Sequence, residues 1–485
     1  MDATILGLGA SGAATSGMTE TTLDRSVAED RLARSGIPGR PPFTVRARVL
    51  TPLDDGGTRF EADGAVVVDG AGRLAYVGAW SVLGGGPAAG GAGSSAPRPL
   101  GQVHDLRPLL LLPGLVDLHA HVPQLPEAGL GAGLDLLAWL EHYTLPLEAA
   151  FDAATAALQA PLVFRSFAAA GTTTLVAYSN ADPEATEAVF EAAEAHGLRA
   201  IVGLVLMDRA ASRGVGGRAW PDAAHGLRAS VELCERWHGR ADGRLGYAFT
   251  PRFAVSCSPA VLCESARLAV QHGAWWQTHL AEDPRELAAV AAAFPDALDY
   301  LDVYDRADAV RPRSILAHAI HLSDREVGRL AGSGAAVAHC PASNLFLPSG
   351  VMPLARYLEA GVRVGLGSDV AGGPSASLFE AMRVGAYAQH ARQLLVGEPA
   401  PPLDALGWLR LGTLDGARAL GLADVTGSLE AGKDADLIAV DPALVEPLPG
   451  AAAADEPAEL VSRLIFRTHP SMIRGAWVRG RLLPA

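Results

Sequence analysis

The segment Asp117-Leu118-His119-Ala120-His121 follows an apolar run from Leu109 to Val116 that is interrupted by Pro113-Gly114. A β-strand sends residues i and i+2 to the same side, so His119 and His121 are expected to project from one face at a strand end. One cation could bind both imidazoles. The pair alone is weak evidence, because a buried or surface histidine is more common than a metal ligand.

Three further segments place acid/base or metal-binding side chains at the ends of apolar, strand-like runs. Because four such strand ends follow one another along the chain, they indicate the mouth of a barrel of parallel strands. The three segments are Gln277-Thr278-His279-Leu280-Ala281-Glu282, Leu316-Ala317-His318 and Gly365-Leu366-Gly367-Ser368-Asp369.

The chain after Pro113 alternates between strand-like runs and amphipathic helical patterns. Eight strands with intervening helices over about 250 residues predict a (β/α)8 TIM-like barrel, in which active sites lie at the C-terminal strand ends. The predicted strands are Leu115–His121, Thr172–Tyr178, Arg199–Leu206, Leu245–Phe249, Trp275–His279, Ile315–His318, Ala336–His339 and Arg363–Gly367.

The two ends of the chain favour a second, smaller domain. Short β-rich runs between residues 43 and 77 are separated by Asp-Gly and Gly turns, which is typical of antiparallel strands. Similar runs return at Ser428–Asp441 and Met472–Leu483. We therefore predict a small β-sandwich domain from both chain ends. The predicted boundaries are a flexible arm over 1–41, the first part of the β-domain over 42–112, the barrel over 113–425 and the second part over 426–485. Residues 84–99 are expected to form a surface loop.

Composition excludes several classes of protein. The 485 residues carry a formal net charge of −14, so no basic surface for nucleic acid or anionic lipid is expected. The longest apolar stretches fall short of the ~20 residues that a membrane span needs. Four scattered cysteines do not form a disulfide framework. With Asp2 and no arginine before Arg25, the N-terminus lacks the pattern of a secretory signal, and we expect a cytoplasmic protein.

The residues at the predicted barrel mouth suit metal-dependent hydrolysis. Three imidazoles and a carboxylate can hold Zn²⁺ and leave a position for water, whose pKa would fall to near ~7. Glu282 follows one of the ligand strands and is predicted to shuttle protons, while His318 can hydrogen-bond the water or a charge on the substrate. Fe²⁺ or Mn²⁺ could occupy the same site. The predicted ligands are His119, His121, His279 and Asp369.

Motifs beyond the histidines resemble the amidohydrolase superfamily. The stretch from Pro113 to His121 is similar to its first-strand motif, and Gly427 to Leu437 to its return into the small domain. Within the superfamily the chain most resembles the guanine deaminases, over about residues 43 to 485. The segments that carry this resemblance are His121–Gln124, Trp139–Pro146, Pro251–Cys257, His339–Asn344 and Ser368–Gly373.

This resemblance implies zinc-dependent hydrolysis of guanine to xanthine and ammonia, with one Zn²⁺ per chain and a homodimeric assembly. It implies the same four metal ligands, proton transfer by Glu282 and Asp369, and orientation of water and substrate by His318. Gln124, Arg252 and Phe253 would hold the purine, because an arginine and a carboxamide can satisfy its carbonyl and ring nitrogens while an aromatic ring stacks on its face.

Other interpretations remain open at this point. Taken alone, Arg252 is expected to form a structural ion pair and Gln124 to bond the backbone of a turn. The superfamily resemblance also allows a sister aminohydrolase acting on 8-oxoguanine, a pterin or a triazine. A non-catalytic scaffold is less expected, because every ligand is present. Binuclear members bridge two metals with a carboxylated lysine, and Lys433 is the first lysine of the chain. The His-x-Glu and Pro-Cys-x-x-Cys motifs of cytidine-deaminase folds do not occur.

Overall fold

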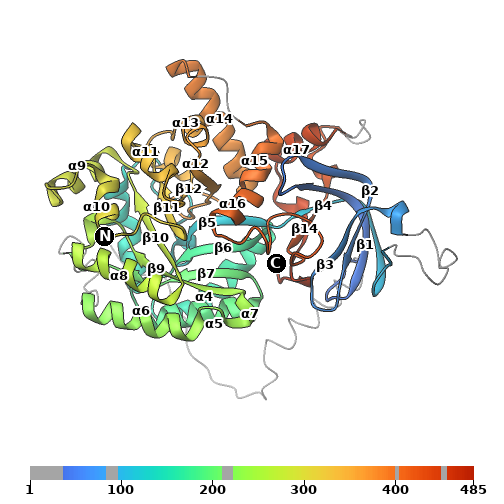
Figure 1. Cartoon of the computed structure of the whole chain (residues 1–485), viewed down its shortest axis with the longest axis horizontal. Coiled ribbons are helices and arrows are strands. Elements are labelled where there is room, and N and C mark those ends of the chain that lie inside the picture. Colours follow the sequence, from blue (N-terminus) through green and yellow to red (C-terminus); the bar gives the residue numbers. More distant parts are fainter. Residues whose placement is uncertain (1–35, 84–96, 210–221, 399–402, 449–455) are drawn as a thin grey trace, which may run out of the picture.

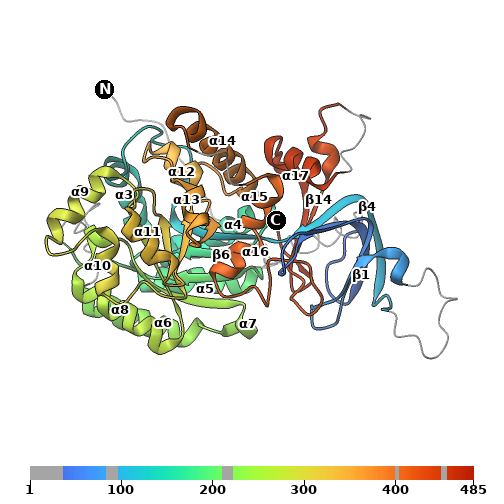
Figure 2. The same cartoon turned by 45° about the horizontal axis from the view of Figure 1, so that its top comes forward.

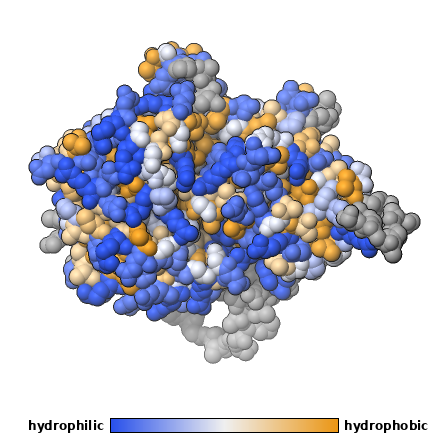
Figure 3. All heavy atoms as spheres, in the orientation of Figure 1, coloured by the Kyte–Doolittle hydropathy of each residue, from blue (hydrophilic) through white to orange (hydrophobic). Residues whose placement is uncertain are grey.

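The structure, a computed structural model, describes residues 36–83, 97–209, 222–398, 403–448 and 456–485. Residues 1–35 of the predicted arm and residues 84–96 of the predicted loop lie outside these ranges. The described chain forms a barrel and a smaller sheet, which Figures 1 and 2 show side by side from two directions. The face seen in Figure 3 is mostly hydrophilic, as expected when apolar side chains are buried in two such cores.

The larger part is the predicted barrel of parallel strands, and its strands follow one another in chain order. Each predicted strand is present. The strand predicted over Arg199–Leu206 is divided into β7 and β8, and β8 pairs with β9. The barrel strands are β5 (Leu115–His121), β6 (Thr172–Tyr178), β7 (Arg199–Gly203), β8 (Val205–Leu206), β9 (Leu245–Pro251), β10 (Trp275–Leu280), β11 (Ser314–His318), β12 (Ala336–His339) and β13 (Arg363–Leu366).

The barrel closes at its mouth, between its first and last strands. Just beyond the end of β13, the Asp369 amide donates to the His119 carbonyl at 2.8 Å. The His121 amide donates to the Val370 carbonyl at 3.1 Å. These bonds tie the loop after the last strand to the end of the first, so the four strand ends predicted to share a site surround one opening.

Helices surround the barrel, and many begin at a residue whose side chain caps the first turn. Asp182, Ser258 and Ser323 each accept a hydrogen bond from a backbone amide of the helix that follows. No helix among the described residues has the length and apolar character needed to cross a membrane. The main helices are α4 (Ala153–Ala169), α5 (Pro183–His196), α6 (Ala223–Trp237), α8 (Pro259–His272), α9 (Pro284–Ala293), α10 (Tyr300–Arg306), α11 (Asp324–Ala331), α12 (Pro341–Phe346), α13 (Leu354–Glu359), α14 (Leu378–Val396), α15 (Ala405–Leu411), α16 (Leu414–Ala419) and α17 (Pro457–Phe466).

The smaller part is built from both chain ends, as predicted. Its strands form one seven-stranded sheet in the order β16-β15-β14-β4-β1-β2-β3 rather than two separate sheets. Backbone bonds join Leu74 at the start of β3 to residues 432 and 433, which precede β14, and side chains from both parts of the sheet share one core. The strands are β1 (Phe43–Pro52), β2 (Thr58–Val68), β3 (Leu74–Ala79), β4 (Gln102–Pro113), β14 (Leu437–Val440), β15 (Ile473–Val478) and β16 (Arg481–Leu482).

The antiparallel arrangement expected for residues 43–77 is confirmed, whereas the next strand, β4, runs in the other sense relative to β1. β1, β2 and β3 pair antiparallel, but β1 pairs parallel with β4. β4 leads through Pro113 and Gly114 directly into the first barrel strand, and this connection sets its direction.

A buried ion network fastens the barrel to the small domain. Arg199 at the start of β7 donates to Asp434 at 2.8 Å and to Asp436 at 2.9 Å, and its side chain is 2% exposed. Arg479 donates to the same Asp434 carboxylate at 2.8 Å. Removing one member of such a network leaves the remaining charges buried without their partner.

Arg199→Ala is therefore expected to lower the free energy of unfolding by about 3–5 kcal/mol, the scale for breaking a buried ion pair. Urea denaturation at pH 7 measures the change. Arg240, which pairs with Glu194 on the surface, provides the control. Arg240→Ala should cost no more than about 1 kcal/mol, and equal losses in the two variants would contradict a special role for the buried network.

Candidate active site

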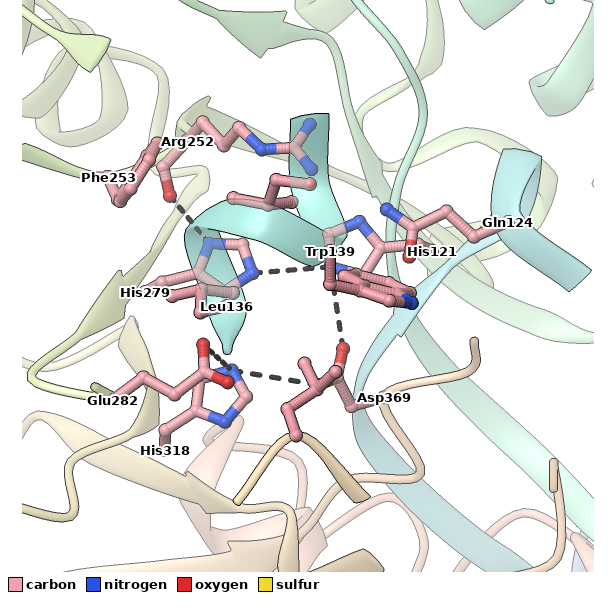
Figure 4. A pocket seen from close by; sticks show the side chains of 12 residues that line it. His121, Gln124, Leu136, Trp139, Arg252, Phe253, His279, Glu282, His318 and Asp369 are labelled. Carbon is pink, nitrogen blue, oxygen red and sulfur yellow. Dashed lines mark hydrogen bonds and ion pairs between the residues drawn. The ribbon is translucent and has the colours of Figure 1, made fainter. Parts of the chain in front are cut away.

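The predicted site residues meet at the C-terminal ends of the barrel strands. His119 and His121 lie on β5, His279 on β10 and His318 on β11, while Asp369 follows β13. Figure 4 shows His121, His279, His318 and Asp369 converging on one point together with Glu282, and His119 Nε2 lies 3.1 Å from the same Asp369. All of these side chains are buried except that of His279, which is half-buried.

Local irregularities in the backbone aim these side chains into the barrel. Val116 and Leu118 pack in the barrel interior, so strict alternation would turn His119 outward. The pairing of β5 with β6 shifts register between Asp117 and Ala120, however, and both histidines reach Asp369 at the centre. His318 has a φ of 69° and Asp369 a φ of 48°, conformations that cost energy for residues with a side chain and often occur at functional sites.

The distances between the predicted ligand atoms fit a single cation. His119 Nε2 lies 3.1 Å and His121 Nε2 3.5 Å from Asp369 Oδ1. His121 Nε2 and His279 Nε2 are 3.2 Å apart. Tetrahedral ligands bonded at ~2.1 Å are about 3.4 Å from one another. His119 Nε2 also lacks a partner with hydrogen-bond geometry although it is buried, so a metal ion would satisfy atoms that the described protein leaves unsatisfied.

The protonation states expected at these positions favour a cation. Burial lowers the pKa of His119 and lowers the pKa values of His121 and His279 further, so the three imidazoles are neutral and can donate electron pairs. Burial opposes ionisation of Asp369, but the nearby histidines, His119 above all, outweigh it and hold the pKa of Asp369 well below its usual range. The site therefore combines neutral nitrogens with an anionic oxygen.

Neighbouring groups fix the orientation of the rings. His279 Nδ1 lies 2.6 Å from the Arg252 carbonyl, which makes Nδ1 the protonated nitrogen and turns an unprotonated Nε2 to the centre. Asp117 accepts hydrogen bonds from the His119 and Ser368 amides at 3.2 and 3.0 Å. These contacts hold the first strand and the last loop in a fixed relation.

Glu282 and His318 form an acid/base pair beside the cluster. Glu282 Oε2 lies 3.4 Å from His318 Nε2, and Ser349 donates to Glu282 Oε1 at 3.1 Å. Burial raises the pKa of Glu282 to about 7 against the opposing effect of His318. Burial alone would lower the pKa of His318, but the carboxylates of Glu282 and Asp369 raise it overall. A carboxyl group that titrates near neutrality can both accept and release a proton.

A pocket opens onto this cluster. Gln124 and Arg252 line its polar wall, and Phe253 belongs to an apolar group that covers it. The covering segment follows β5 and consists of η2 (Val122–Glu127), α2 (Leu136–Trp139), η3 (Leu140–Thr144) and α3 (Leu145–Ala150). The apolar lining residues are Leu136, Trp139, Leu140, Phe253 and Leu347.

The sequence interpretation missed one buried charge behind this wall. Glu148 on α3 pairs with Arg252 and accepts a hydrogen bond from Gln124. Arg252 thus forms the structural ion pair considered as its alternative role, and it lines the pocket as well. Glu148 stands two residues after the motif Trp139–Pro146, and this position was the one sequence feature that could have drawn attention to it. Nothing in the sequence connected Glu148 to Arg252.

Comparison with known proteins identifies the family. A model of the amidohydrolase family matches residues 110–483. The chain belongs to the amidohydrolase family. The predicted resemblance is thereby confirmed, together with the hydrolase class that it implied.

Several proteins similar to this chain are named guanine deaminases. The probable guanine deaminase of Deinococcus radiodurans is 40% identical over 384 residues, which cover 79% of this chain and 83% of the relative. The guanine deaminase of Escherichia coli K12 is 35% identical, with 70% of this chain and 75% of the relative covered.

Solved structures share this fold over most of the chain. An E. coli guanine deaminase matches with a TM-score of 0.78 at 30% identity and covers 91% of this chain and 98% of its own. An adenosine deaminase from Xanthomonas campestris, solved with bound zinc, matches with a TM-score of 0.75 at 27% identity and covers 92% and 93% of the two chains. Structures named guanine deaminase and adenosine deaminase thus share this fold.

Proposed function

We propose that this amidohydrolase removes the amino group of guanine by hydrolysis and releases xanthine and ammonia. The observation that carries the proposal is the pocket itself, in which His121, His279 and Asp369 share one lining with Gln124 and Arg252. His119 lies directly behind, 3.1 Å from Asp369. The guanine deaminases similar to this chain support the choice of guanine.

The proposed cofactor is one Zn²⁺ per chain, held by the same four residues, with Fe²⁺ as an alternative. The zinc bound by the Xanthomonas neighbour supports this choice. A divalent ion in such a site lowers the pKa of water to near ~7 and so supplies a nucleophile at neutral pH.

The protein side chains supply the proton transfers. Glu282 accepts the first proton of the attacking water and delivers it to the ring nitrogen next to C2 of guanine. As the carbon–nitrogen bond breaks, the proton of the new hydroxyl passes to the departing amino group through Glu282 and Asp369, which leaves a carbonyl at C2 and ammonia. His318, whose Nδ1 lies 2.9 Å from the side-chain oxygen of Asn344, turns Nε2 toward the charge that develops at C2.

The apolar cover and the polar wall would hold the purine. Phe253 and Trp139 offer aromatic surface to its ring, and the guanidinium of Arg252 can donate to its carbonyl oxygen. A pocket shaped in this way also excludes bulk water, which strengthens the polar contacts within it.

The proposal is tested by a panel of purines, pyrimidines, pterins and triazines scored for ammonia release with purified, metal-quantified protein. Guanine should show the highest kcat/KM, with adenine and cytosine far below, because a site that bonds a ring carbonyl leaves buried groups unpaired when another ring occupies it. A clearly higher kcat/KM for 8-oxoguanine, a pterin or a triazine would transfer the assignment to a sister aminohydrolase and leave the metal site intact.

A homodimer and a cytoplasmic location are part of the same proposal. Large apolar side chains are exposed at the end of α14, at the top of Figure 3, which is consistent with a protein interface. They are Leu394, Leu395 and Val396.

A further inference from the structure

A buried carboxylate, Glu148, lies behind the polar wall of the pocket and contacts both of its side chains. Glu148 Oε1 accepts a hydrogen bond from Gln124 Nε2 at 2.7 Å, and Oε2 pairs with Arg252 Nη1. The Glu148 side chain is 0% exposed, and those of Gln124 and Arg252 are 1% and 3% exposed. Each carboxylate oxygen therefore has one partner, and both partners reach the substrate pocket.

The position of Glu148 is fixed by the barrel. It lies in the last turn of α3, where Asn180 at the end of β6 donates to the Glu148 carbonyl at 3.1 Å and to the Phe151 carbonyl at 2.5 Å. Gln124 belongs to η2 and Arg252 follows β9. Segments from three parts of the barrel mouth thus meet at one carboxylate.

This carboxylate determines which groups Gln124 and Arg252 can present. Both oxygens of the Glu148 carboxyl face N–H donors, one of them on a permanently charged guanidinium, so this group acts as an acceptor toward both. Gln124 must then turn its amide nitrogen toward Glu148, since the opposite orientation would place two oxygens against each other. The Gln124 carbonyl oxygen remains for the pocket as an acceptor. Arg252 donates one N–H to Glu148, and its other guanidinium N–H groups remain as donors for the pocket. Among the described residues, the side chains of Gln124 and Arg252 form no hydrogen bond other than the one to Glu148.

We propose that Glu148 is a positioning residue that sets this acceptor–donor pattern and thereby selects a purine with a lactam edge. Guanine and hypoxanthine carry a carbonyl at C6 beside N1–H, which matches the Arg252 donors and the Gln124 acceptor. Adenine and 2,6-diaminopurine carry an amino group at C6 beside an unprotonated N1. The amino group would face the Arg252 donors, and N1 would face the Gln124 acceptor, so neither hydrogen bond could form. The proposal rests on the proposed function, because it concerns the same pocket.

The test replaces Glu148 by glutamine, which has the same shape but can donate as well as accept a hydrogen bond. In this variant Gln124 can turn either its amide nitrogen or its carbonyl oxygen toward the pocket. Hypoxanthine and adenine have no amino group at C2, and their dissociation constants can be measured by calorimetry without turnover. The wild-type chain should prefer hypoxanthine, and Glu148→Gln should reduce this preference about tenfold or more. The ratio of kcat/KM for guanine to that for 2,6-diaminopurine should fall in the same direction, with unchanged metal content.

Glu127→Gln is the matched control. Glu127 is also buried near the pocket, but its carboxylate accepts a hydrogen bond from Thr144 at 2.8 Å. This variant should keep the hypoxanthine preference within about threefold of the wild-type value, the range of a small indirect effect. A similar loss of preference in both variants would overturn the specific role of Glu148.

Two further results decide the proposal. If Glu148→Gln only lowers the melting temperature and keeps the hypoxanthine preference, Glu148 is merely structural. If that variant does not fold, Gln124→Met removes the acceptor while it leaves the Glu148–Arg252 pair in place, and an unchanged preference there would overturn the proposal. A wild-type chain that does not deaminate guanine overturns the proposed function separately, because the ligand preference is measured without turnover.

Discussion

Replacing His279 by alanine is expected to remove the metal and the activity together. The proposed site loses one of three imidazoles, and the Nε2 atom of His121 loses the partner that lies 3.2 Å away. A catalytic metal contributes several kcal/mol to stabilisation of the transition state, which corresponds to about 10³-fold or more in rate. Elemental analysis after metal-replete purification should give close to one divalent ion per wild-type chain and far less for His279→Ala.

His196→Ala serves as the control for this experiment. His196 lies at the end of α5, where its Nε2 bonds to the Pro484 carbonyl at 2.8 Å, so its loss should leave the metal content unchanged. A wild-type chain with two metals, or with none, would refute the mononuclear site. A His279→Ala variant that keeps its metal would remove His279 from the proposed ligands.

Most of the barrel could be predicted because each strand has its own local signal. The strand Thr172–Tyr178, for example, is a short run of β-branched and apolar residues between helical patterns, and the structure places its ends at the same residues. β4 has no such signal, since Gln102, Asp105 and Arg107 interrupt its first half. It forms because β1 and β14 lie on either side of it, and such long-range pairing is not visible along the chain.

The site shows the same division between local and long-range information. The histidines could be found because they stand at strand ends, where a parallel barrel brings side chains together. The shift of register in β5 and the positive φ of His318 are set by packing around the site and have no sequence pattern of their own. Glu148 is 104 residues from Arg252 in sequence, and only the folded chain brings them into contact.

Glu282 is the residue on which the proposed proton transfers depend. Its carboxyl group lies 3.4 Å from His318 and is held by Ser349, and it is nearly fully buried. Glutamine has the same shape and can keep the contact with Ser349, but it cannot carry a proton from water to the ring. Glu282→Gln should therefore lower kcat by about 10²- to 10⁴-fold, the range of general acid/base catalysis.

Metal content separates this role from that of a ligand. In Glu282→Gln it should stay at the wild-type level, and KM for guanine should change little, because the proposed purine contacts are made by Gln124, Arg252 and Phe253. Glu127→Gln, the same substitution at a carboxylate bonded to Thr144, should leave kcat near the wild-type value. If metal content instead falls in parallel with kcat, then Glu282 holds the ion. The proton shuttle would then be sought at His318, whose Nε2 lies 3.7 Å from Asp369 Oδ2.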